Sequence, residues 1–60
     1  MPVVDISLFT GRTAEQKLSA ARAISSALVE HLDATPESVQ VIFRDVAHAD
    51  WVRPDDLAEA

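Results

Sequence analysis

The chain changes hydrophobic periodicity twice, and that order limits the folds open to it. Residues 2–8 and 39–46 repeat apolar side chains at every second position, which is typical of half-buried strands. Residues 14–32 repeat them every three or four positions, which predicts one amphipathic helix. Two strands separated by so long a connection are expected to pair in parallel through a right-handed crossover. The sequence therefore predicts an α/β fold, a single β-α-β unit in one domain spanning residues 1–60.

The predicted helix has recognisable ends. Thr13 and Gln16 have the spacing of a capping box, so the helix is expected over residues 14–32. Residues 33–36 should end it and begin one short turn, since proline suits a first helical position. The apolar stripe of the helix consists of Leu18, Ala21, Ile24, Ala27, Leu28, His31 and Leu32.

Each predicted strand has an apolar face, but one chain cannot bury both faces of the sheet. Parallel sheets are normally covered on both sides, and one helix covers only one. A chain of 60 residues without cysteine also has no disulfide to stabilise a small core, so a homo-oligomer is expected. The apolar faces consist of Val4, Ile6 and Leu8 in the first strand and Val39, Val41 and Phe43 in the second; Gln40, Ile42 and Arg44 share the opposite face of the second.

Charge and composition exclude several classes of function. The net charge is -5 and the basic residues are scattered, which argues against nucleic acid as a partner. There is no signal-peptide pattern and no apolar run long enough for a membrane span, so a cytoplasmic protein is expected. His31 and His48 are far apart, and His48 with Asp50 supplies only two ligands, so we expect no metal. No cofactor motif is evident. His31 suits the helix end, and Asp55, Asp56 and Glu59 read as a solvated acidic tail.

Pro2 follows the initiator methionine, and removal of Met1 would leave a secondary amine at the start of the chain. Burial and nearby cations would lower the pKa of that amine toward neutrality, where a proton-transfer base works best. This is a chemical group that no side chain supplies.

The chain resembles the small-subunit tautomerase superfamily, typified by 4-oxalocrotonate tautomerase, over nearly its whole length. The resemblance is carried by Pro2, the strand ending at Leu8, the run Gly11-Arg12-Thr13-Ala14-Glu15-Gln16-Lys17, Trp51 and the ending Leu57-Ala58. It implies a β-α-β subunit that dimerises into a four-stranded sheet. It also implies further assembly of the dimers, commonly into a homohexamer that is a trimer of dimers.

The resemblance also implies a site. Pro2 matches the family's general base, which moves a proton within a small enolisable 2-oxo acid or dienol. Arg12 matches an arginine that binds a substrate carboxylate, and a guanidinium can hold a carboxylate with two parallel hydrogen bonds. Trp51 matches an aromatic wall that keeps the site dry. Each has a plainer reading as well: Arg12 as the ion-pair partner of a neighbouring subunit, and Trp51 as an interface anchor.

Two departures from the family stand out. Where the family has a second substrate-binding arginine, this chain has Gln40, which donates hydrogen bonds but carries no charge. Arg44 lies on the same strand face about 13 Å away, so it could reach a site only from a neighbouring chain, or else is a solvent or interface residue. Residues 53–56 replace the family's paired glycines, which puts its C-terminal hairpin in doubt.

Three kinds of function stay open at this point. The first is a tautomerase that uses Pro2 as general acid or base on a small carboxylate. The second is a sister activity of the superfamily: decarboxylation, dehalogenation or hydration of a small unsaturated acid. The third is an assembly protein that keeps the oligomer but has lost efficient catalysis with its second arginine. A cation converging on the Pro2 nitrogen in the oligomer would favour the enzymes.

Overall fold

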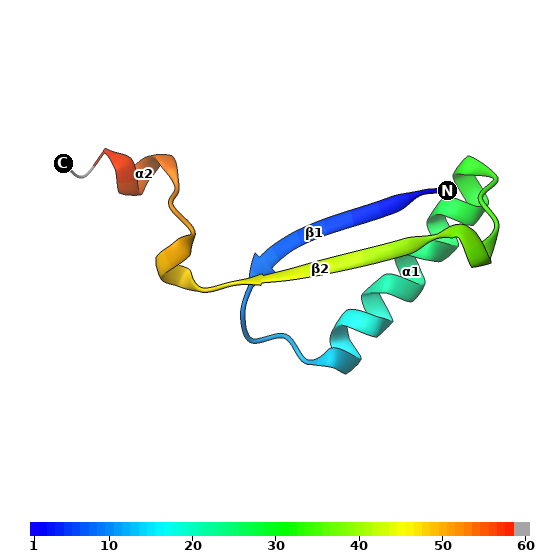
Figure 1. Ribbon diagram of the computed structural model, residues 1–60, viewed down its shortest axis with the longest axis horizontal. Helices are drawn as coiled ribbons and strands as arrows, with labels where there is room; N and C mark the ends of the chain where they lie inside the picture. Colours follow the sequence, from blue (N-terminus) through cyan, green and yellow to red (C-terminus); the bar gives the residue numbers. More distant parts are fainter. Residues whose placement is uncertain (59–60) are drawn as a thin grey trace.

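The computed structural model describes residues 1–58 and has the predicted order of elements. Strand β1 (Val3–Phe9), helix α1 (Ala14–Leu32) and strand β2 (Gln40–Val46) form the β-α-β unit (Figure 1). The strands pair in parallel, from Val3 opposite Gln40 to Phe9 opposite Val46. The predicted α/β fold with one parallel strand pair is therefore confirmed. Glu59, assigned above to the acidic tail, lies outside the described residues.

Helix α1 has the predicted bounds because both of its ends are capped. The backbone N–H of Thr13 donates to Gln16 Oε1 at 2.9 Å, and the N–H of Gln16 donates to Thr13 Oγ1 at 3.0 Å, which completes the capping box. At the other end Asp33 adopts the left-handed conformation, with φ of 57°, and the N–H of Ala34 donates to the Leu28 carbonyl at 3.4 Å. A single 3-10 turn follows, with Pro36 in its first position as predicted.

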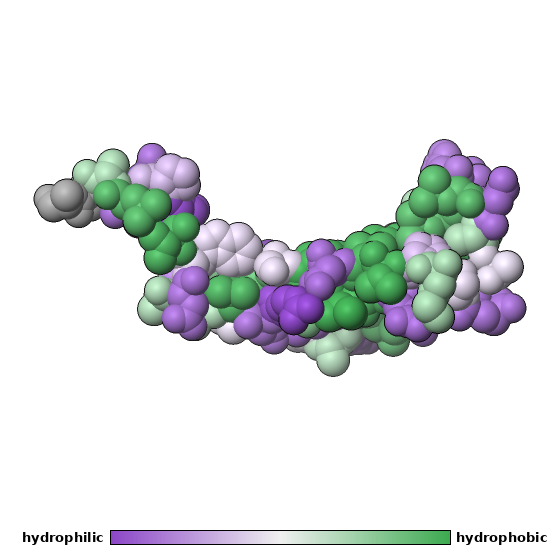
Figure 2. Space-filling model, turned by 45° about the horizontal axis from the view of Figure 1, so that its top comes forward, coloured by the Kyte–Doolittle hydropathy of each residue, from purple (hydrophilic) through white to green (hydrophobic). Residues whose placement is uncertain are grey.

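The strands alternate as the sequence predicts, but no residue between 1 and 58 is fully buried. Val4, Ile6, Leu8, Val41 and Phe43 are half-buried, and their neighbours along each strand are exposed, except that Phe9 beside Leu8 is also half-buried. The helix leaves Leu18 51% exposed, and the opposite sheet face leaves Val3 53% exposed. Figure 2 shows apolar side chains gathered over the middle of the molecule, with polar groups among them. A single copy thus has apolar faces but no closed core.

The C-terminal segment forms a short helix, so the doubt about a hairpin was justified. After β2 the chain makes a 3-10 turn, His48–Asp50, and then helix α2 (Pro54–Leu57), which lies beyond the end of the strand pair (Figure 1). Pro54 occupies the first turn, and the Asp56 carboxylate accepts a hydrogen bond from the Arg53 N–H at 3.0 Å. Both features favour a helix start where paired glycines would favour a turn. Within residues 1–58, no helix has the length and apolar character needed to cross a membrane.

Candidate functional site

A hollow of about 460 Å³ lies where both strands end. Parallel strands place their carboxyl ends at one edge, so the segment after β1 and the segment after β2 meet there. Gly11 lets the chain leave β1 sharply, since its φ of 122° is rarely adopted by residues with a side chain. We call this the Arg12 hollow, and it is lined by Leu8, Phe9, Thr10, Gly11, Arg12, His48 and Trp51.

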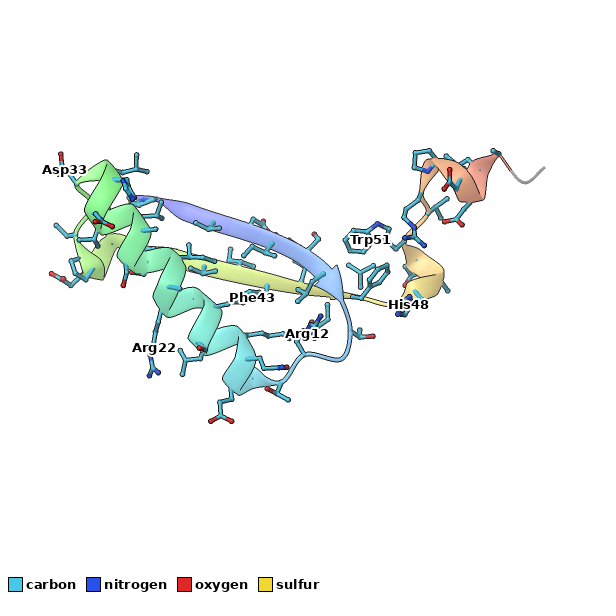
Figure 3. The ribbon with its side chains drawn as sticks, turned by 180° about the vertical axis from the view of Figure 1, so that it is seen from behind. Arg12, Arg22, Asp33, Phe43, His48 and Trp51 are labelled. Atoms are coloured by element: carbon cyan, nitrogen blue, oxygen red, sulfur yellow. The ribbon has the colours of Figure 1, made fainter. Side chains whose placement is uncertain are left out.

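The wall of the Arg12 hollow is aromatic. The ring of His48 stacks on that of Phe9, with centroids 4.1 Å apart and 11° between the planes. Trp51 contacts the same Phe9 ring at 4.7 Å and 42°. The turn between them is held by a hydrogen bond from the Trp51 N–H to the His48 carbonyl at 3.2 Å. Figure 3 shows Arg12, His48 and Trp51 around this end of the strand pair, and Asp33 at the opposite end.

Arg12 and Trp51 therefore line the same hollow, and their roles as carboxylate-binding arginine and aromatic wall stay predictions. Among the described residues, no carboxylate lies within ion-pair distance of Arg12. Phe9 and His48 were not predicted as members of this site. The available signals were the position of Phe9 at the end of its strand and the three-residue spacing of His48 and Trp51.

Pro2 and Gln40 lie together at the other end of the strand pair. The Gln40 N–H donates to the Pro2 carbonyl at 3.0 Å, which places Gln40 at the start of β2 as predicted. A second hollow of about 630 Å³ lies beside Pro2; we call it the Pro2 hollow. Its lining residues are Met1, Pro2, Leu32, Asp33, Ala34, Thr35 and Ser38.

Within one copy, Pro2 and Gln40 at one end of the strand pair are far from Arg12 and Trp51 at the other. Strand β1 has 7 residues between Pro2 and the loop that carries Arg12, and at about 3.3 Å per residue it separates the two hollows by about 23 Å. A small acid cannot span that distance. The predicted site residues can act together only if the Pro2 end of one copy meets the Arg12 end of another.

Arg44 is held by a partner within its own chain. Its Nε and one terminal nitrogen donate to the two carboxylate oxygens of Asp5, at 2.8 and 2.9 Å. These hydrogen bonds, and secondarily the charge of Arg44, lower the pKa of Asp5 below its ordinary value. The same contacts raise the pKa of Arg44. Both side chains are on the exposed strand face, so Arg44 joins neither hollow of its own copy.

The described residues offer no cluster for a metal ion. Among residues 1–58, no three histidine, aspartate or glutamate side chains are grouped so that they could hold one. His31 lies in the last turn of α1, beside Glu30 at 3.5 Å.

Comparison with known proteins adds to this geometry. The model of the family described as tautomerase enzyme matches residues 2–60. A protein of Ralstonia nicotianae named as a probable tautomerase is 39% identical over 51 residues, which are 85% of this chain and 78% of the relative.

Solved structures give the same picture. One from work on the 4-oxalocrotonate tautomerase isozymes of Methylibium petroleiphilum superposes with a TM-score of 0.83 at 32% identity, covering 88% of this chain and 83% of the other. A heterohexameric 4-oxalocrotonate tautomerase from Chloroflexus aurantiacus gives a TM-score of 0.82 at 31% identity, covering 90% and 87%.

Proposed function

The chain belongs to the tautomerase family as a 4-oxalocrotonate tautomerase-like isomerase, and we propose that the secondary amine of Pro2 is its catalytic base. The observation that carries this proposal is that the family match begins at Pro2, the first residue after the methionine. In the structure Met1 is 86% exposed, so the peptide bond between them is accessible to processing. While Met1 is attached, the Pro2 nitrogen is part of an amide and is not basic. Once Met1 is removed, the same nitrogen is a secondary amine with a basic lone pair.

The reaction needs one proton and no other reactant. The Pro2 amine takes a proton from the carbon beside the keto group of a small 2-oxo acid, or from the hydroxyl group of an enol or dienol, and the electron pair moves into the conjugated system. The resulting ammonium returns the proton to another atom of that system, so the substrate is isomerised with its atoms conserved. A base for this purpose needs a pKa near the working pH, which an apolar surrounding and a neighbouring cation both produce by destabilising the ammonium form.

The other site residues hold the substrate. Arg12 binds a carboxylate through its guanidinium fork, and Trp51 with Phe9, whose rings are tilted by 42°, offers an apolar aromatic wall to a conjugated acid. Gln40 lies next to Pro2, where its amide can donate a hydrogen bond to the oxygen on which charge develops. Arg44 is kept as a candidate only through another copy, because Asp5 holds it within its own.

The site is proposed to form between copies in a homohexamer that is a trimer of dimers. Two features support this: the separation of Pro2 from Arg12 within one copy, and the lack of a fully buried residue among those described. The relative from Chloroflexus aurantiacus is a heterohexamer, so assembly with a different subunit is the alternative.

The test is the activity of Pro2→Ala on the enol form of a small 2-oxo acid. General base catalysis contributes about 10²–10⁴-fold, and alanine leaves a primary amine, so we expect a fall in kcat/KM toward the lower end of that range. Pro36→Ala is the matched control, since Pro36 lies in an exposed turn. Mass spectrometry of the active parent should show Met1 absent. A parent active with Met1 retained, or a Pro2→Ala variant of full activity, would remove Pro2 from the mechanism.

Gln40 favours a second candidate function. Because Gln40, the residue beside Pro2, carries no charge, a sister activity of the superfamily, which is decarboxylation, dehalogenation or hydration of a small unsaturated acid, is the alternative. An intact oligomer inactive on all such acids would instead point to the assembly protein.

A further inference from the structure

The Arg12 hollow is selectively basic. The chain has ten Asp and Glu residues against five Lys and Arg, yet Arg12 and His48 are the ionisable side chains that line this hollow, and no carboxylate among residues 1–58 joins them. The composition of the lining therefore favours an anionic ligand.

His48 is held in place for such a ligand. Stacking on Phe9 at 4.1 Å fixes the plane of the imidazole, so its ring nitrogens lie at the free edges of the stack. The hydrogen bond from the Trp51 N–H to the His48 carbonyl, at 3.2 Å, fixes the backbone of the same residue. Within the described part of the chain, His48 has no ion-pair partner that would occupy those nitrogens.

We propose that His48 is a substrate-binding residue that holds a carboxylate together with Arg12 and determines the preference for acidic substrates. Arg12 supplies a permanent charge, and His48 adds an N–H donor that is cationic when the imidazole is protonated. This inference rests on the proposed function for its substrate class. In a site that has Gln40 in place of a second arginine, His48 is the group that restores a second cation.

The proposal makes binding depend on pH, and the surrounding charges set the sign. Protonation of the imidazole adds a positive charge to the hollow, and histidine is the type of side chain that exchanges a proton near neutral pH. A guanidinium is charged over the whole of this range. The nearby acidic groups are directed elsewhere: Asp50, on the same turn, lines a separate hollow, and Asp45, at the end of β2, is paired with Lys17 at 2.8 Å.

The experiment measures binding of adipate, a saturated six-carbon diacid, to the full-length oligomer by calorimetry at about pH 6 and about pH 8, a range in which histidine side chains exchange a proton. Adipate lacks the 2-oxo group, so Pro2 cannot enolise it and binding is measured apart from chemistry. The parent should bind more tightly at the lower pH. His48→Phe keeps the stacked ring and removes both nitrogens, and it should bind about tenfold more weakly at the lower pH.

Two variants act as controls. His48→Arg keeps a planar, charged group, so it should bind at both pH values, with the pH dependence reduced to what the Pro2 amine contributes. His31→Gln removes the other histidine, which is exposed at the end of α1, and should behave like the parent. Parent-like binding by His48→Phe, or failure of adipate to bind the parent, would each overturn the inference.

The role of His48 and the role of Pro2 are tested by different measurements, so either one can be wrong while the other is right. If Pro2→Ala loses isomerase activity while His48→Phe binds adipate normally, His48 is not a substrate-binding residue and Pro2 remains the base. If Pro2→Ala is fully active while His48→Phe binds adipate much more weakly than the parent, the role of His48 in the Arg12 hollow is supported, and a group other than Pro2 must move the proton.

Discussion

At the scale of single residues, the chain has Arg12 and Gln40 at the two positions where the resemblance implies charged anchors. Arg12 lies in a hollow with an aromatic wall, and Gln40 lies beside Pro2. The resemblance supplied the roles of Arg12, Trp51 and Gln40, which stay predictions. It missed Phe9 and His48, because the meeting of side chains from two loops depends on turn geometry that spacing along the chain does not encode.

The presence of Gln40 where the resemblance implies an arginine predicts a low kcat/KM for dicarboxylate substrates. Gln40→Arg should raise kcat/KM for a dicarboxylate dienol about tenfold or more, since a hydrogen bond to a charged group contributes roughly 1.5–3 kcal/mol and about 1.4 kcal/mol is tenfold in rate. A monoacid should gain less, and Arg12→Ala should weaken binding of both. Steady-state kinetics with one diacid and one monoacid on all three proteins checks this. A parent that already processes the diacid as fast as Gln40→Arg would mean that another cation, His48 or the Arg44 of a neighbouring copy, fills the position.

The Asp5–Arg44 pair predicts a small, acid-sensitive contribution to stability. Because the pKa of Asp5 is lowered in the folded chain, the pair stabilises the fold above the pKa of an unfolded aspartate, about 3.9, and this contribution is lost as the pH falls through the lowered value. Both side chains are exposed, so the effect at neutral pH should be slight. Thermal unfolding of the parent and Asp5→Asn between neutral and strongly acidic pH should show two curves that converge in acid. If the difference in unfolding temperature between the parent and Asp5→Asn stayed the same at every pH, the proposed dependence of stability on Asp5 ionisation would be wrong.

At the scale of elements, local signals located the β-α-β unit and failed at the tail. The capping box at Thr13 placed the start of α1, and the predicted strands differ from the observed ones by a single residue at their ends. Helix α2 was not predicted, because its 4 residues are too few to show periodicity. Its signals were Pro54 in the first turn and the Asp56 carboxylate that caps the Arg53 N–H.

The capping box predicts a measurable cost for its removal. Thr13→Ala leaves the Gln16 N–H without its side-chain acceptor and should lower the free energy of unfolding by about 1 kcal/mol per chain. Thr13→Ser keeps the hydroxyl and is the matched control. Chemical denaturation at fixed protein concentration measures the difference; equal midpoints for Thr13→Ala and the parent would show that packing alone sets this helix end.

At the scale of the whole molecule, one copy is more extended than a compact domain. Its radius of gyration is 15.1 Å and its extents are 48 × 23 × 14 Å, whereas a compact domain of this length has a radius of gyration of about 10 Å. Apolar side chains are exposed on the uncovered sheet face, at Val3 and Ile42, and on the helix, at Leu18. The expectation of oligomerisation came from the short chain without cysteine, from a sheet that one helix cannot cover and from the family resemblance, and the geometry supports it independently.

The shape predicts assembly at micromolar concentration. Sedimentation should give a species of about 39 kDa if six chains of 6.5 kDa associate. Ile42→Glu places a charge on the uncovered sheet face and should shift the protein toward smaller species, and Ile42→Val should not. A folded, stable monomer of the parent would overturn both the assembly and the shared site.

The separation of Pro2 from Arg12 along β1 has a consequence for mixed populations. Neither Pro2→Ala nor Arg12→Ala can form a complete site alone, yet each supplies the half that the other lacks. Unfolding the two together and refolding them as an equal mixture should make about one site in four complete in a randomly mixed oligomer. Two inactive proteins should thereby regain roughly a quarter of the parent's activity, and a damaged copy of this chain would impair its neighbours as well as itself.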